Sequence, residues 1–578
     1  MRRPAFGVER RGWVWSNAAA STAVKIRRGL AAALAALTLS APAGAEPVGP
    51  ILSAASNFAQ VWRPADLDAA AALGVRDLRD AVYWAEIERP LGRYDWSRFT
   101  RSWPALLPPR DMTMSLTVNN PHPDVDGGET PHTDAGRAAW AAFAAAAAVR
   151  FPAVHSVEVG NEMNSARFVS GPLETAPLAE RAALYTALLA ETARAVRAVR
   201  PEVRILGGAA HSLSLSWLGA LAEAGAPAHM DALAVHPYTT DPEQLAPQVA
   251  LLRALPGFAD MPLEVTEFGT EDALTAADDF LRAYCQMGLV GVVRAVWYPL
   301  TARGDGLIPL MEGGAATDVG LAYRLAAARM EGRALSDAAP DPFTYGCAYE
   351  GGALVLWGAP RSVTLAPGVR AVDATGADWT GPPTLSRDGV LVLLDDGAAP
   401  VLGDTVRLAP QRLRADNVDQ FAYPGQPGDP FQRVLRQSGR EWPLELRPGQ
   451  EKPGVPWTPY LATARDGVAR AGPGWVLPSR WDSGPLDMVQ RHVASEAGRQ
   501  DVTLEVEVAE RSEDGIDLRV TLDGADLLVR RIDGAERIVL ADVARAAGSV
   551  LEVVVGPGDS ARGDVTALRI TLSDPAGP

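Results

Sequence analysis

Short apolar runs alternate with Ala- and Leu-rich stretches through the first half of the chain, and this alternation limits the fold more than any other feature. The runs have the length and composition of buried strands. The stretches between them carry apolar residues at helical spacing. Eight runs can be counted, at residues 51–57, 75–83, 112–119, 154–160, 203–208, 230–236, 261–267 and 292–298. Eight strand–helix units in about 280 residues predict an α/β fold of the (β/α)₈ TIM barrel type.

The second half of the chain has a different pattern. Beyond about residue 337, strand-like runs alternate with Gly and Pro turns and helical spacing is lost. A chain of 578 residues also exceeds what one hydrophobic core holds. We therefore expect all-β sandwich domains after the barrel, with these divisions: barrel 46–336, small β-sandwich 337–410, linker or irregular segment 411–438, and C-terminal β-sandwich 439–578.

The first 45 residues have the composition of an export signal. Basic residues precede an apolar run at 30–39, and the small residues 43–45 form a cleavage site. That run is too short to span a bilayer, and no later stretch approaches the roughly 20 apolar residues that a membrane helix needs. We expect an exported protein, periplasmic or extracellular, without a membrane span.

Charge and cysteine content exclude several classes of function. The formal net charge is −16, and the leader is basic, so the remainder is more acidic still. Nucleic acids and anionic membranes are poor partners for such a surface. No Cys/His spacing resembles a zinc site and no glycine-rich phosphate loop follows a strand, so we predict neither metal nor cofactor. Cys285 and Cys347 could pair or remain buried thiols, and the sequence leaves both open.

Two glutamates occupy the positions where a barrel of this type does its chemistry, the C-terminal ends of the strands. Glu162 follows the fourth run and Glu267 ends the seventh, whereas Glu158 and Glu264 fall within their strands. A single glutamate at a strand end is more often a helix cap or a surface ion pair. Two of them across the barrel mouth provide what a retaining glycosidase requires, one group to protonate the leaving oxygen and one to attack the anomeric carbon.

The surrounding motifs resemble those of glycoside hydrolase clan A. Asn161-Glu162 and Glu267 look like the clan signature. The run 79–88 resembles the second-strand motif of members near family 39, which includes β-xylosidases and bacterial exopolysaccharide hydrolases. His236-Pro237-Tyr238 and the run 291–298 are similar to the same group. The resemblance covers the whole barrel.

Carried over by motif, the resemblance implies the following roles. Glu162 is the general acid/base, whose pKa must be raised for it to carry a proton at neutral pH, and Glu267 is the nucleophile, which must stay ionised. Arg79 lies close to Glu267 and favours its carboxylate form. A surface ion pair is the alternative role for Arg79.

Four further residues are implied to hold the substrate or the nucleophile. Asn161 would hydrogen-bond the sugar 2-hydroxyl, and His236 or Tyr238 would hold an oxygen of the nucleophile. Trp297 would form the aromatic floor of the −1 subsite. A structural histidine and a core aromatic are the alternatives for His236 and Trp297.

Loops at the same end of the barrel offer additional candidates. Asn119 and His122 follow the third strand, His211 follows the fifth, and Trp62 follows the first. Binding residues concentrate on such loops, so we expect these four to line the cleft.

Two functions of different class are compatible with these residues. The first is hydrolysis of a β-linked polysaccharide or oligosaccharide, and the second is an inactive carbohydrate-binding or scaffolding barrel. The retained glutamate pair favours the enzyme, since an inactive barrel would lose it first. The C-terminal domain carries none of the candidate residues, so we expect it to bind carbohydrate or to be purely structural. A chain ending near Leu408 should then hydrolyse a small aryl glycoside as fast as the whole protein.

Overall fold

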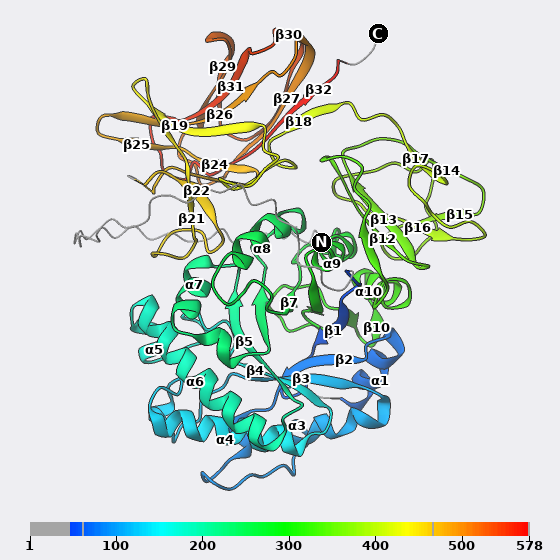
Figure 1. The fold of residues 1–578 in the computed structure, drawn as a ribbon, viewed down its shortest axis with the longest axis vertical. Helices are drawn as coiled ribbons and strands as arrows, with labels where there is room; N and C mark the ends of the chain where they lie inside the picture. The colour runs from blue at the N-terminus through cyan, green and yellow to red at the C-terminus, as the bar shows by residue number, and fades with distance from the viewer. Residues whose placement is uncertain (1–46, 61–62, 465–466, 576–578) are drawn as a thin grey trace, which may run out of the picture.

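The computed structural model describes residues 47–60, 63–464 and 467–575. The leader expected at 1–45 and the candidate Trp62 lie outside the described residues. A helical barrel forms one end of the molecule, and two β regions lie at the other (Figure 1). Among the described residues, no helix is both long and apolar enough to cross a membrane.

Eight parallel strands close into a barrel, with β1 paired to both β2 and β8. The strands are β1 (Ile51–Ala55), β2 (Asp77–Ala81), β3 (Thr113–Val118), β4 (Val154–Val159), β5 (Arg204–His211), β6 (Ala232–His236), β7 (Leu263–Phe268) and β8 (Val292–Trp297). Each predicted run supplies one of these strands. The predicted fold, a (β/α)₈ barrel followed by all-β domains, is confirmed.

Helices cover the outside of the barrel. The longer ones are α1 (Pro64–Leu73), α4 (Asp134–Arg150), α6 (Leu178–Val199), α7 (Leu215–Glu223), α8 (Leu245–Arg253), α9 (Ala276–Leu289) and α10 (Asp318–Arg329). Short turns are α2 (Trp84–Ile87), α3 (Phe99–Ser102) and α5 (Pro172–Thr175). α4 illustrates the local cause: the Thr133 hydroxyl caps its first turn by accepting from the Gly136 amide. Its Trp140 and Phe143 face the core.

A small β region follows the barrel, as predicted. Its main sheet has the strand order β11-β12-β13-β16-β15, and a separate pair joins β14 to β17. The strands are β11 (Leu335–Asp337), β12 (Thr344–Tyr349), β13 (Ala353–Gly358), β14 (Val363–Leu365), β15 (Val369–Val372), β16 (Leu391–Asp395) and β17 (Val406–Leu408). A disulfide between Cys285 of α9 and Cys347 of β12 ties this region to the barrel. Of the two states that the sequence left open for these cysteines, the structure shows the bonded one.

The C-terminal domain is a sandwich of two antiparallel sheets around its own apolar core. One sheet contains β18 (Leu413–Asp416), β21 (Glu445–Arg447), β22 (Tyr460–Ala462), β23 (Arg470–Gly472), β24 (Trp475–Leu477), β27 (Gly498–Val508), β30 (Ala535–Arg545) and β32 (Thr566–Ser573). The other contains β19 (Phe431–Gln437), β20 (Arg440–Pro443), β25 (Ser479–Trp481), β26 (Gly484–Val493), β28 (Ile516–Leu522), β29 (Ala525–Ile532) and β31 (Val550–Pro557).

The segment 411–438 is not a linker, which corrects the expected domain division. Its strand β18 pairs with β32, the last strand of the chain, and β19 pairs with β26. The segment looks irregular in sequence because Pro, Gly and Asp fill the connection between these two short strands. The C-terminal domain therefore begins near Leu413.

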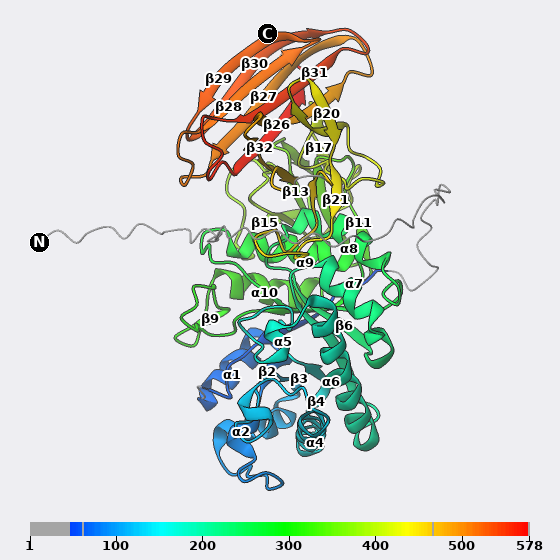
Figure 2. The ribbon, with the colours of Figure 1, turned by 90° about the vertical axis from the view of Figure 1, so that its left-hand side faces the viewer.

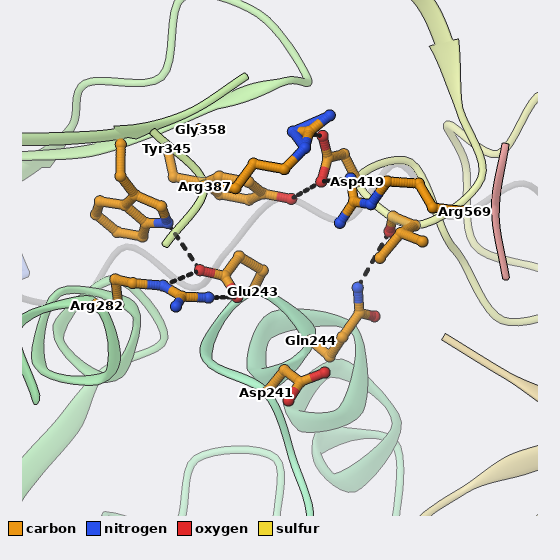
Figure 3. Close-up of a pocket in the computed structure, with 11 residues that line it drawn as sticks. Asp241, Glu243, Gln244, Arg282, Tyr345, Gly358, Arg387, Asp419 and Arg569 are labelled. Atoms are coloured by element: carbon orange, nitrogen blue, oxygen red, sulfur yellow. Dashed lines mark hydrogen bonds and ion pairs between the residues drawn. The ribbon is translucent and has the colours of Figure 1, made fainter. Parts of the chain in front are cut away.

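Polar contacts join the three parts around a cavity of about 230 Å³ (Figure 3). Glu243 of the barrel accepts from Trp357 of the small β region at 2.7 Å and is paired with Arg282. Asp419 of the C-terminal domain lies between Arg387 and Arg569, at 3.0 and 3.1 Å. Contacts such as Glu243–Trp357 and Asp419–Arg387 cross from one part to another, so the cavity lies at the junction of the three parts. The side view shows the C-terminal domain stacked over the rest of the molecule (Figure 2).

Candidate active site

The barrel brings the two predicted glutamates together. Glu162 and Glu267 are buried, with 6% and 9% of their surfaces exposed. The Nδ1 atom of His236 lies 3.1 Å from Oε1 of Glu162 and 3.7 Å from Oε2 of Glu267. One carboxylate oxygen of each glutamate lies within 4.8 Å of one from the other. The carboxyl groups of a retaining glycosidase are similarly close, whereas an inverting enzyme needs room for a water between them.

The backbone at the end of β4 turns sharply to present Glu162. Gly160 has a φ of +87°, and a Cβ there would lie 2.3 Å from the sulfur of Met163. Glu162 itself has a φ of +46°, a left-handed conformation that a side chain makes costly. Strain of this kind collects at functional sites, where the surrounding structure holds it in place.

Arg79 on β2 organises the nucleophile side of the site. Its guanidinium donates to the carboxylates of Glu158 and Glu267 and, at 2.8 Å, to the side-chain oxygen of Asn161. The Tyr238 hydroxyl donates to Oε2 of Glu267 at 3.0 Å. Both oxygens of Glu267 therefore accept hydrogen bonds, which fixes the orientation of the carboxylate. Because Asn161 accepts through its oxygen, its amide nitrogen remains directed away from the arginine.

His236 lies between the two glutamates and is fully buried. Burial alone would lower its pKa, but the charge of Glu267, the proximity of Glu158 at 3.7 Å and the hydrogen bond to Glu162 outweigh burial and raise the pKa to about 9. Burial likewise acts to raise the pKa of Glu162, yet the hydrogen bond and charge of His236 lower it. The raised pKa expected for Glu162 is thus wrong for this arrangement. The proton of the pair rests on His236, which donates it to Glu162.

Glu158 also belongs to this network. Its position within a strand gave no reason to predict a role for it from the sequence. Its carboxylate accepts from Arg79 and, at 2.9 Å, from the Thr266 hydroxyl, which also contacts Nε2 of His236 at 3.1 Å. Burial raises its pKa, but Arg79 and His236 outweigh burial and lower it to about 2. A buried arginine needs buried counter-charges. The prediction of Arg79 within a barrel strand could therefore have suggested that another carboxylate besides Glu267 faces it.

One loop candidate, His211, lies near this network. The His211 ring is half-buried, 6.2 Å from the ring of Tyr238. Burial lowers the pKa of His211, and the charge of Glu162 partly offsets that effect. Asn119 is half-buried at the end of β3 and accepts from Asn120 at 2.7 Å. Its contact with a substrate stays a prediction.

The structure corrects His122. The ring is fully buried, its Nε2 lies 2.7 Å from the Glu88 carbonyl, and its Nδ1 accepts from the Asp124 amide. Both nitrogens serve the backbone and the ring packs on Trp84, so His122 does not line the cleft. Its position directly after a strand was not enough to distinguish a structural histidine from a binding one.

Trp297 is buried more deeply than a sugar platform requires. Only 1% of its surface is exposed, its indole N–H donates to the Ile308 carbonyl at 3.0 Å, and its ring packs edge-on against Phe268. The next residue, Tyr298, is the half-buried aromatic at this strand end, with its hydroxyl donating to Asp305 at 2.6 Å. The sequence motifs indicated Trp297 and gave no signal for Tyr298, which directly follows it.

The C-terminal domain also contacts the segments that follow β4 and β5 at the barrel mouth. Gln450 hydrogen-bonds to Asn164, two residues beyond Glu162, and the Trp457 ring lies 4.9 Å from that of His211. The folded chain thus places residues from beyond position 439 against the barrel mouth.

Within the described residues, Glu162, His236 and Glu267 form one group whose ligand atoms are close enough to hold a metal ion. Donors from Arg79 and Tyr238 already occupy both oxygens of Glu267. The charge of the cluster is also offset by Arg79 and by the protonated His236, so hydrogen bonds alone account for the arrangement.

Comparison with known proteins gives structural matches only. No family model and no curated protein matches the sequence. Three matching structures are a family 39 glycoside hydrolase from Bacteroides cellulosilyticus WH2 (15% identity, 61% of this chain and 81% of that one, TM-score 0.48), a GH39 β-xylosidase from Caulobacter crescentus (18%, 61% and 98%, 0.41) and the GH39 enzyme from Xanthomonas axonopodis pv. citri (16%, 89% and 96%, 0.42). The function proposed below rests on the residues of the site.

Proposed function

We propose that the chain is a retaining glycoside hydrolase that acts on a β-linked polysaccharide or oligosaccharide. The observation that carries the proposal is the approach of Glu162 and Glu267 to within 4.8 Å at the mouth of the barrel, with Arg79 and Tyr238 orienting Glu267. A scaffolding barrel would have no use for two buried carboxylates held this close, since the repulsion between them costs stability.

In the first step, the Glu267 carboxylate attacks the anomeric carbon and forms a glycosyl ester, while the glycosidic C–O bond breaks. The leaving oxygen takes its proton from Glu162. The proton resting on His236 can reach Glu162 along their 3.1 Å hydrogen bond when a substrate displaces water from the mouth. In the second step, Glu162 removes a proton from water, and the water oxygen replaces Glu267 at the anomeric carbon.

Asn161 is assigned to the substrate side of the site. Arg79 holds its side-chain oxygen, and its amide nitrogen is then a donor for a sugar hydroxyl beside the nucleophile. We assign the protein to the periplasm or the extracellular space, because the leader has an export pattern and the Cys285–Cys347 disulfide is typical of oxidising compartments.

Replacing Glu162 tests the proposal after a panel of 4-nitrophenyl β-glycosides has identified the accepted sugar. Glu162→Ala should lower kcat/KM about 10²- to 10⁴-fold for poor leaving groups and much less for the 2,4-dinitrophenyl glycoside, which leaves without a proton. Added azide should restore turnover and give a β-glycosyl azide. An α-azide would mean that the roles of Glu162 and Glu267 are reversed, and inactivity across the panel would reject the function.

A further inference from the structure

The connection between β21 and β22, residues 448–459, projects from the C-terminal domain onto the barrel, and we call it the 448–459 loop. Figure 1 shows β21 and β22 on the side of the domain that faces α7 and α8. The Leu215 amide at the start of α7 donates to the Pro448 carbonyl at 3.0 Å. The loop therefore rests on the same end of the barrel as the glutamate pair.

Gln450 attaches the loop to the segment that carries Glu162. Its side chain donates to the Asn164 carbonyl at 2.8 Å and accepts from the Asn164 side chain at 2.9 Å. Asn164 also accepts from the His211 amide at 2.9 Å. One buried asparagine thus links the ends of β4 and β5 to the C-terminal domain.

Trp457 lies next to these contacts. Its ring meets the His211 ring edge-on with centroids 4.9 Å apart, and the indole is half-buried. The His211 amide is in turn hydrogen-bonded to the side chain of Asn164, two residues beyond Glu162, at 2.9 Å. Trp457 therefore lies next to the segment that carries Glu162.

The loop has a fixed shape. The Gln450 amide donates to the Pro456 carbonyl at 2.7 Å, which closes the loop, and the Tyr423 hydroxyl donates to the Pro459 carbonyl at 3.0 Å. Gly449 has a φ of +78°, and a Cβ there would lie 2.5 Å from the Thr458 carbonyl oxygen. A loop built this tightly holds Trp457 in one place relative to the barrel.

We propose that Trp457 forms the subsite for the leaving group, supplied by the C-terminal domain, with Gln450 as its positioning residue. This inference rests on the proposed function. The acid protonates the leaving oxygen, so the leaving group lies beside Glu162. An indole offers a broad apolar surface on which a sugar or aryl ring can stack.

The test compares two substrates of the sugar that the wild-type protein accepts: its 4-nitrophenyl β-glycoside and its β-glycosyl fluoride. Fluoride has no ring that could stack on an indole. Trp457→Ala should lower kcat/KM about tenfold for the aryl glycoside, as expected for loss of one ring-stacking contact, and leave the fluoride within about twofold. Gln450→Ala should show the same dependence on the leaving group. Trp442→Ala, at the edge of the other sheet of the domain, is the matched control and should change neither.

Equal losses on both substrates, no loss on either, or the same pattern in Trp442→Ala would overturn the subsite. If the wild-type protein hydrolyses no glycoside of the panel, the proposed function fails and the subsite with it. If the wild-type protein is active and only the leaving-group dependence is missing, the subsite alone fails.

Discussion

The barrel contains buried charges at both of its ends, and the two groups differ in balance. At the beginnings of the strands, Asp77 accepts from Arg294 at 2.6 Å and contacts His155 at 2.7 Å. Glu264 lies 2.6 Å from Arg204 and 3.5 Å from Arg294. Two carboxylates there face two arginines, and we call this group the floor cluster.

At the ends of the strands, three carboxylates, Glu158, Glu162 and Glu267, share one arginine and one histidine. Even with His236 protonated these groups keep one excess negative charge, and the raised pKa of His236, about 9, keeps that proton in place near neutrality. In the floor cluster the two carboxylates are balanced by the two arginines. At the mouth, the charge balance depends on the proton of His236, which can move to Glu162. Burial alone does not distinguish a structural cluster from a catalytic one, but this excess of like charge does.

The largest expected effect is a difference in kcat between variants of two glutamates on β7. Glu267→Gln at the mouth should lower kcat about 10⁴-fold or more, because no nucleophile remains. Glu264→Gln, three residues earlier in the floor cluster, should keep kcat while costing roughly 1–3 kcal/mol of stability, since it removes the buried carboxylate that faces Arg204 and Arg294. Both are measured on folded protein, by turnover of the aryl glycoside and by thermal unfolding. Comparable losses of kcat in the two variants would remove the distinction between the clusters.

The sequence predicted the barrel and the approach of Glu162 to Glu267 because both depend on local signals. Strand runs and helical spacing located all eight strands, and strand-end position selected Glu162 and Glu267. Asp523-Gly524, a dipeptide typical of hairpin turns, joins β28 and β29 with positive φ at both residues.

What the sequence could not show depends on tertiary contact. Glu158 and Glu264 look alike in sequence, each inside a strand, and only the folded barrel places the first beside Arg79 and the second at the floor. His122 and His211 both follow strands, yet one is buried against backbone groups and the other faces the site. The contact of Trp457 joins positions almost 250 residues apart in the chain, which no local pattern encodes.

A smaller effect concerns the proton at the mouth. Since His236 keeps its proton below its pKa of about 9, kcat/KM should fall as the pH rises through about 9. In His236→Asn, Glu162 must hold the proton alone. The alkaline limb of the pH profile of kcat/KM should therefore move to lower pH, and overall activity should drop. His155→Asn, the histidine of the floor cluster, should leave the limb in place. An unchanged limb in His236→Asn would show that another group sets it.

The smallest effect is on stability in acid and concerns the floor cluster alone. Burial acts to raise the pKa of Asp77, but Arg294 and His155 outweigh burial and lower it from 3.8 to about 2. A lowered carboxyl pKa adds stability that is fully present above the unfolded value and is lost as the pH falls through the folded one. Asp77→Asn should therefore lower the Tm of the barrel at pH 6 by a few degrees, and the gap to the wild-type protein should narrow between pH 4 and pH 2. The kcat at neutral pH should not change. If the gap in Tm stayed constant across this range, the Asp77 carboxylate would not be held ionised by its partners, and the contrast between a self-balanced floor and a proton-dependent mouth would lose its electrostatic basis.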